Sequence, residues 1–159
     1  PGIRVTTNGG GTMTVLLENN QISEVANRGI EMIARDGSST LNASLFRNNI
    51  NLASALAADA VHIAAGAIST DTVSVCADIN GDNIVANRNS VFSAGINGIR
   101  VRQRFTGTSF TLEDYAGGPT DVTAVQNFLT ARNVGGDTYV ADFAGAGFGA
   151  IANCPMPAP

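Results

Sequence analysis

The chain has 159 residues, of which 44% are hydrophobic and 14% charged, with a net charge of −4 at pH 7. This composition excludes wholesale disorder, and the acidic balance argues against general nucleic-acid binding. No apolar run is long enough to cross a bilayer as a helix. Glycine reaches 18 residues and asparagine 16, while lysine is absent. This excess of turn-forming residues predicts a single β-rich domain.

A short pattern recurs along the chain, consisting of a small residue followed by apolar, polar and apolar residues. Each copy leads into a second apolar element, and three of the second elements lead into a turn containing asparagine and then an isoleucine. The first pattern occupies residues 2–5, 29–32, 60–63 and 98–101. The second elements begin near Met13, Leu41, Val73 and Phe110. The turns lie at residues 19–20, 48–49 and 82–83, and the isoleucines are Ile22, Ile50 and Ile84.

Such a unit cannot bury its own apolar side, but parallel stacking of successive units buries it and pairs every backbone strand. Asparagine suits the repeated turns because it tolerates left-handed backbone geometry and its amide can pair with the next asparagine in the stack. We therefore predict an all-β fold, a right-handed parallel β-helix (solenoid) of about four short coils over residues 1–118. The alternative is an antiparallel sandwich with coincidental repeats.

Residues 119–134 predict a helix that caps the last coil. Pro119 and Asp121 form a start signal, and apolar residues follow at helical spacing until the glycines at 135–136. A solenoid needs such a cap because its last coil otherwise exposes core side chains and unpaired strand edges.

Residues 135–159 form a glycine-rich tail with apolar and aromatic side chains, among them Tyr139, Phe143 and Phe148. The tail is expected either to pack along its own chain or to extend to a neighbouring subunit as an added strand.

Cys76 and Cys154 are the only cysteines. In a lysine-free, asparagine-rich chain they favour a disulfide of the secreted type, which would pin the tail to the third coil.

Residues 70–159 carry a resemblance to a known group of proteins. Its motifs run from Cys76 through the segment 98–105 and the segment 110–117 to the helix at 121–129. This arrangement resembles the C-terminal end of large secreted bacterial β-strand-repeat proteins, which are adhesin-like surface proteins with pectate-lyase-like β-helices. Residues 1–70 match only as generic coils. The resemblance implies an extracellular, cell-surface structural or adhesive role and brings no catalytic motif.

Arg100, Arg102 and Arg104 alternate with other residues and therefore share one face of their strand. Such a stripe could bind carboxylates or sulfates of an acidic polysaccharide, or an acidic patch on a partner. The alternative is that this face of the strand is simply exposed to solvent.

His62 occupies the repeat position of Arg4 and Arg100, so we expect it on a solvent-facing column and not in a catalytic site.

Asp78, Asn80 and Asp82 resemble the start of an oxygen-rich calcium loop. The twelfth position of that loop holds Asn89, where a bidentate glutamate belongs. An ordinary Asn-Gly turn explains the segment equally well, and no other cofactor is indicated.

The sequence indicates a structural protein and not an enzyme. The only adjacent acidic pair is Glu113 and Asp114, and consecutive strand residues face opposite sides of a sheet. The alternative function is a carbohydrate-binding or polysaccharide-cleaving β-helix.

The chain begins directly inside a repeat, with Ile3 and Val5, so we expect preceding coils of a longer precursor or another subunit to cover these side chains. With the tail aromatics as the covering segment, head-to-tail contacts would build a homo-oligomer or filament.

Overall fold

The computed structural model describes residues 1–80, 83–135 and 138–156, and within them the chain is mostly β-strand with one α-helix. The strands form three sheets, and every strand pairing in these residues is parallel. The prediction of parallel β structure is therefore confirmed, and the antiparallel sandwich is wrong.

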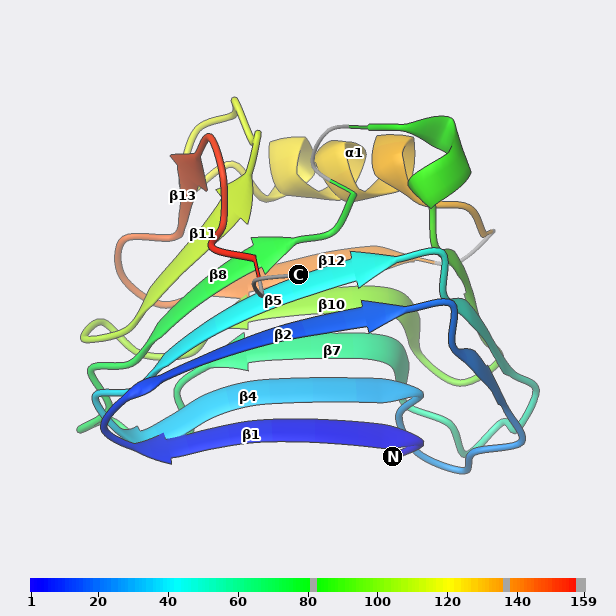
Figure 1. Cartoon of the computed structure of the whole chain (residues 1–159), viewed down its shortest axis with the longest axis horizontal. Helices are drawn as coiled ribbons and strands as arrows, with labels where there is room; N and C mark the ends of the chain where they lie inside the picture. Colours follow the sequence, from blue (N-terminus) through cyan, green and yellow to red (C-terminus); the bar gives the residue numbers. More distant parts are fainter. Residues whose placement is uncertain (81–82, 136–137, 157–159) are drawn as a thin grey trace.

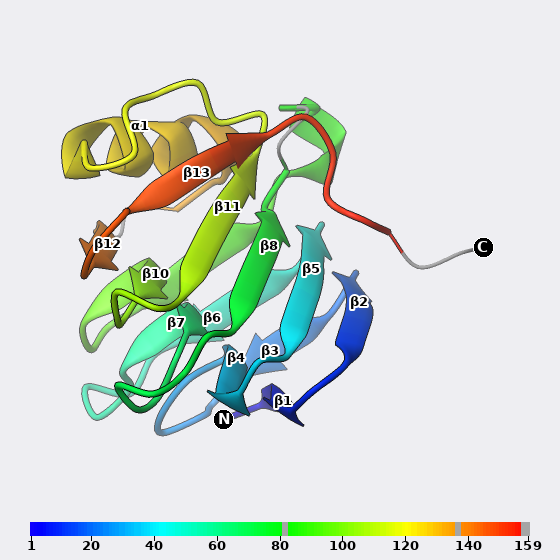
Figure 2. The same ribbon diagram turned by 90° about the vertical axis from the view of Figure 1, so that its left-hand side faces the viewer.

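The chain runs through sheets A, B and C in each of the first three circuits and through sheets A and B in the last two, and we call each circuit a passage (Figures 1 and 2). In spatial order, sheet A contains β1 (Ile3–Gly9), β4 (Ile30–Gly37), β7 (Asp59–Ala65), β10 (Asn97–Gln103) and β12 (Tyr139–Phe143). Sheet B contains β2 (Thr12–Glu18), β5 (Thr40–Phe46), β8 (Ser74–Asp78), β11 (Ser109–Glu113) and β13 (Phe148–Ile151). Sheet C contains β3 (Gln21–Ser23), β6 (Asn49–Leu52) and β9 (Ser90–Ser93).

The strand register follows the repeat seen in the sequence. Ile3 lies opposite Ile30, and Ile30 lies opposite Val61. Val61 in turn lies opposite Ile99. The four copies of the first pattern therefore stack directly on one another in sheet A, as the sequence predicts.

The third passage departs from the predicted alignment in two places. In sheet B, Leu41 lies opposite Val75 and not Val73. In sheet C, Ile50 lies opposite Val91, whereas the predicted Ile84 is about half exposed in the preceding loop. The departure in sheet C follows from an insertion between β8 and β9, which contains the short 3-10 helix η1 (Val85–Asn87) and moves the return to sheet C further along the chain.

The core lies between the sheets and is built from the inward-facing residue of each alternating pair. Its fully buried side chains come from every sheet and include Met32, Leu41, Ile50, Ile63 and Phe110. Burial of each such side chain stabilises the fold by about 1.5–3 kcal/mol before the loss of chain entropy is counted. The hydrophobic effect therefore holds the sheets together, while backbone hydrogen bonds fix the order of the strands.

Four asparagines stack at the turn between sheets B and C. The Asn20 amide donates to Asn48 at 2.8 Å, and the Asn48 amide donates to Asn89 at 2.9 Å. Asn89 in turn donates to Asn133 at 2.9 Å. The sequence predicts such pairing at these turns, but it places the third turn at residues 82–83, of which 82 lies outside the described residues. The third member is Asn89 because the insertion precedes it.

The turn between sheets A and B stacks in a similar way. Gly37 has a positive φ of 140°, and a Cβ at this position would lie 2.4 Å from the carbonyl oxygen of Gly9 in the passage below. Only glycine allows this approach. The buried hydroxyls of Thr7 and Ser39 meet beside it at 2.9 Å.

The helix α1 (Val122–Arg132) lies across the end of the stack opposite to β1 (Figures 1 and 2). The Asp121 carboxylate accepts a hydrogen bond from the backbone N–H of Ala124, as the start signal predicts. Val125, Phe128 and Leu129 are buried against the core. Within residues 1–80, 83–135 and 138–156, no helix has the length and apolar character that a membrane span requires.

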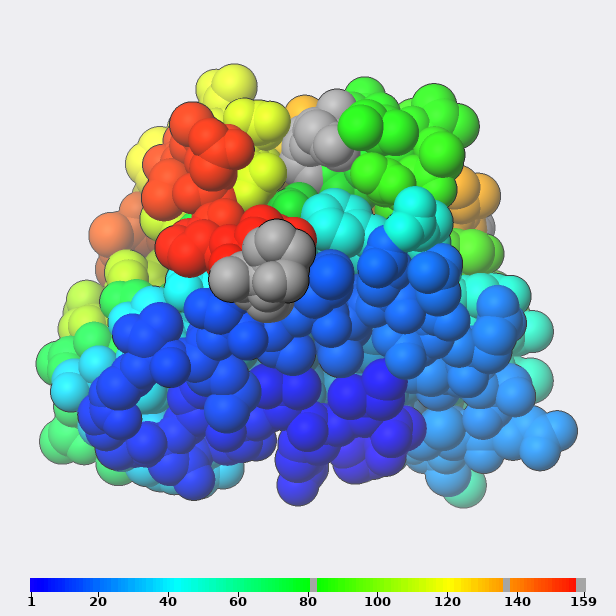
Figure 3. Space-filling view, viewed as in Figure 1, coloured from blue at the N-terminus to red at the C-terminus, as the bar shows by residue number. Residues whose placement is uncertain are grey.

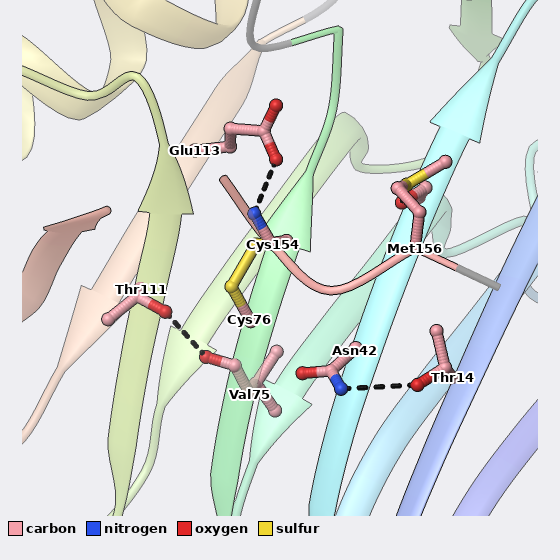
Figure 4. Close-up of a disulfide and its surroundings, with 9 residues drawn as sticks. Thr14, Asn42, Val75, Cys76, Thr111, Glu113, Cys154 and Met156 are labelled. Carbon is pink, nitrogen blue, oxygen red and sulfur yellow. Dashed lines mark hydrogen bonds between the residues drawn. A yellow bond between two sulfur atoms is a disulfide. The ribbon is translucent and has the colours of Figure 1, made fainter. Parts of the chain in front are cut away.

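The glycine-rich tail packs on its own chain and forms a fifth passage. β12 pairs with β10 in sheet A, and β13 pairs with β11 in sheet B. Beyond β13 the chain turns across the outer side of sheet B, where Cys154 forms the predicted disulfide with Cys76 (Figures 2 and 4). The Cys154 N–H donates to the Glu113 carboxylate, and the Ser44 hydroxyl contacts the Met156 sulfur.

We predict that Asn48→Ala lowers the free energy of unfolding by about 2–4 kcal/mol, because it leaves several buried polar partners without a hydrogen bond. Asn48 is 1% exposed and also donates to the Leu17 carbonyl. Urea denaturation followed by circular dichroism measures the change. The matched control is Asn49→Ala, one residue further along on the exposed side of the sheet. An equal effect of the two substitutions would contradict the role of the ladder.

Candidate functional site

The outward face of sheet A carries a column of polar side chains. Arg4 lies opposite Glu31, and Glu31 lies opposite His62. Arg100 follows His62 in the next strand. The residues stack as the repeat predicts, but the expectation that His62 is solvent-facing is wrong. Glu31 is 2% and His62 4% exposed, because ion pairs and neighbouring side chains cover the column.

Arg28, in the loop before β4, joins two of the buried carboxylates. Its guanidinium forms ion pairs with Glu31 and with Asp59, the latter at 3.4 Å. Arg4 binds the other oxygen of Glu31 at 2.5 Å. Asp59 also accepts a hydrogen bond from the amide of Asn97 at 2.6 Å. The sequence indicates none of these partners for Asp59, since it precedes the repeated pattern.

His62 is the titratable group at the centre of this network. Its Nδ1 lies 3.1 Å from the Asp59 carboxylate, but neither ring nitrogen has a hydrogen-bond partner of good geometry among the described residues. Burial lowers the pKa of His62 below its ordinary value, and the positive charges of Arg28 and Arg102 lower it further. Asp59 opposes this change. The ring is therefore neutral at pH 7.

The two buried carboxylates stay ionised for a different reason. Burial alone would raise the pKa of Glu31, but hydrogen bonds and charge from Arg4 and Arg28 outweigh it and hold this pKa below its ordinary value. Burial also opposes ionisation of Asp59, whose pKa is nevertheless lowered by the nearby His62 ring, by the hydrogen bond from Asn97 and by the charge of Arg100. The network therefore consists of charges that depend on one another.

The predicted arginine stripe lies on the same face, but an acidic partner sits beside it. Arg100 and Arg102 place Nε at 2.7 and 3.2 Å from the same oxygen of Asp142. Arg104 is exposed, and its guanidinium lies 5.7 Å from the centre of the Phe105 ring. Asp142 belongs to β12, in the register position of Arg102. The inward residues Tyr139 and Ala141 match Ile99 and Val101, and this spacing, which puts Asp142 at the position of Arg102, is the signal that could have found it.

The three residues predicted to bind calcium cannot all be placed, and the two that are described have other surroundings. Asp78 ends β8 and is buried. Asn80 is also buried, and its amide donates to the carbonyl of Arg132 at 2.9 Å. Asp82 lies outside the described residues. Within the described parts of the chain, no three His, Cys, Asp or Glu side chains gather in a way that could hold a metal ion.

The residues predicted for assembly divide into two groups. Ile3 and Val5 are half-buried on the first passage and pack against the core. Tyr139 and Phe148 are 5% and 1% exposed in the core of their own chain, and Phe143 is half-buried. The tail aromatics thus serve the fifth passage, so in this structure they are not available to cover another subunit.

We predict that acidification destabilises the fold in two steps. A lowered pKa means that the unfolded chain binds protons more readily, so the contribution of His62 is lost as the pH falls below about 6.5. The contributions of Glu31 and Asp59 are lost below about pH 4.5. Unfolding free energies measured by urea titration across this range test the sign.

His62→Gln provides the control for the first step, because His62 is the only histidine of the chain. The variant should lose the slope between about pH 7 and pH 5.5 and keep the fall at lower pH. An unchanged slope in the variant would assign it to other groups.

Comparison with models of protein families, with curated proteins and with solved structures finds no match to this chain.

Proposed function

We propose that the chain is a right-handed parallel β-helix module that serves as an extracellular structural or adhesive scaffold without chemistry of its own. The observation that carries this proposal is the unbroken stacking of side chains from passage to passage. The asparagine ladder runs through the turns, and the Arg4–Glu31 pair stacks on the outside. Such ladders add directional bonds to a continuous core, which suits a rigid rod-like support.

The disulfide supports the extracellular part of the proposal. Cys76 and Cys154 are 78 residues apart in the sequence, and both are buried in the bonded state. Stable disulfides of this kind form in oxidising compartments. The bond also lowers the entropy of the unfolded chain, which favours survival outside the cell.

The alternative function, carbohydrate binding or cleavage on the charged face of sheet A, has less support. Its histidine is buried, and the Glu113 carboxylate accepts the Cys154 N–H. A hollow of about 310 Å³ near β13 contains one acidic residue, Asp114, among mostly apolar neighbours. Two carboxylates are needed for the common mechanisms of glycoside hydrolysis.

We expect the chain to release no reducing ends from polygalacturonate, dextran or a soluble β-glucan in a reducing-sugar assay, because the carboxylates and the histidine that meet on sheet A, Glu31, Asp59 and His62, are buried. Turnover of any of these substrates would overturn the scaffold proposal. Binding to polygalacturonate that is lost in Arg102→Ala would support the alternative function on the arginine stripe.

Self-association is a second part of the proposal. β1 and β2 each have one edge without a paired strand among the described residues, and a row of free backbone groups is a template for another chain. Ile3 donates its N–H to the carbonyl oxygen of Gly29, the residue before β4, so by alternation the N–H groups of Arg4 and Thr6 face the open edge. We expect a second copy of the chain to pair its strands with these open edges.

We predict that Thr6→Pro reduces self-association, because proline removes an N–H that faces the open edge and leaves the bonds to β4 intact. Light scattering over a concentration series measures the effect, and Thr6→Ala is the matched control. A wild-type chain that stays monomeric at every concentration would contradict this part of the proposal.

A further inference from the structure

The outward faces of the three sheets differ in what covers them. On sheet A, the ion-pair network leaves Glu31 and His62 almost without solvent contact. On sheet B, Asn42 and Ser44 are buried, and the disulfide-linked tail crosses the face (Figures 3 and 4). Nothing in the described chain covers sheet C, where outward residues are exposed along all three strands.

The outward residues of sheet C form two columns in register. Gln21 lies opposite Asn49, and Asn49 lies opposite Ser90. In the second column, Ser23 lies opposite Asn51, and Asn51 lies opposite Phe92. We call these six residues the sheet C face. Each is exposed, and none is charged, while Ile22, Ile50 and Val91 between them point to the core.

The polar groups of this face are not used by the fold. In the described chain, the side chains of Gln21, Asn49 and Asn51 form no hydrogen bond with protein, whereas Asn48, next to Asn49, is bonded on both sides. Each free amide offers two donors and an acceptor. A shallow depression of about 230 Å³ lies among these side chains, lined by Gln21, Ile22, Ser23, Asn49 and Asn51.

We propose that the sheet C face binds a neutral, hydroxyl-rich glycan. Amide and hydroxyl side chains can donate to and accept from sugar hydroxyls, in columns repeated at the strand spacing of about 4.8 Å. The Phe92 ring is 43% exposed and offers a flat apolar surface to the C–H face of a sugar ring.

The absence of charge on the sheet C face selects the partner. An acidic glycan or a nucleic acid would require cations, and the six side chains supply none. A stable protein interface requires an apolar centre, whereas five of the six side chains are polar. The inference rests on the adhesive part of the proposed function, since it names what such a module adheres to.

The test is affinity electrophoresis of the full chain through gels that contain a soluble β-glucan, a galactomannan, a xyloglucan or dextran, with polygalacturonate as the charged comparison. We expect at least one neutral polysaccharide to retard the protein. Phe92→Ala and the double variant Asn49→Ala/Asn51→Ala should each weaken that binding about tenfold or more. Circular dichroism and thermal unfolding verify that each variant is folded.

The matched control is Ser69→Ala/Thr70→Ala, which changes two exposed polar residues in the loop after β7 and should leave retardation unchanged. Retardation by none of the four neutral polysaccharides would overturn the inference. So would binding to polygalacturonate alone, or retardation that survives both substitutions of the sheet C face. Loss of self-association in Phe92→Ala without any glycan binding would identify the face as a contact between copies instead.

The outcomes for glycan binding and for the scaffold role are separate. A chain that binds no glycan and releases no reducing ends overturns the inference and leaves the scaffold role intact. Release of reducing ends overturns the scaffold role, whatever the retardation shows.

Discussion

Parallel hydrogen bonding between equivalent strands of successive passages decides which side chains can meet in this protein. Because each residue lies directly above its counterpart, one position of the repeat becomes a column that runs along the stack. In a column of identical polar residues, each side chain can form a hydrogen bond with the next one, as the asparagines do at the turn between sheets B and C. Columns of ionisable groups require alternating charge, which Arg4 and Glu31 provide. The choice of residue at one position therefore constrains the same position in every passage.

The same constraint explains where the chain tolerates extra length. The insertion before β9 and the helix α1 both lie in turns, where added residues leave the stacking of the neighbouring strands unchanged. Strands have no such freedom, since a shift of one residue would move Val91 from the core to the surface. New surfaces therefore arise from inserted turns and from the outward side chains of each sheet.

The parallel sheets could be predicted from the sequence because the first pattern recurs at short intervals in four successive passages. The misplacement of Ile84 shows the limit: an isoleucine after an asparagine turn satisfies the pattern, but the position of the return to sheet C depends on how an insertion folds. The fifth passage is hard to predict from the sequence for a related reason. The helix α1 and the loops on both sides of it separate β11 from β12, so the pattern at Tyr139 is read as a new segment and not as another copy.

The candidate face of sheet A was only partly predictable. Alternation alone places Arg100 and Arg102 on one side of a strand. Their partner Asp142 comes from the fifth passage, and the ion pairs beside His62 involve Arg28 and Asp59, which lie outside the repeated pattern. Sequence patterns report which way a side chain points, while its exposure depends on neighbours that other passages supply.

The bond between Cys76 and Cys154 has a mechanical consequence. A pulling force applied to the end of the chain beyond Cys154 passes through the sulfur atoms directly into β8. The chain between the two cysteines, which includes β11, α1 and β13, then forms a closed loop that carries no tension. Under load, only the strands before Cys76 can be drawn out. The bond therefore makes the module inextensible over the half that carries the helix, whatever the strength of its individual hydrogen bonds.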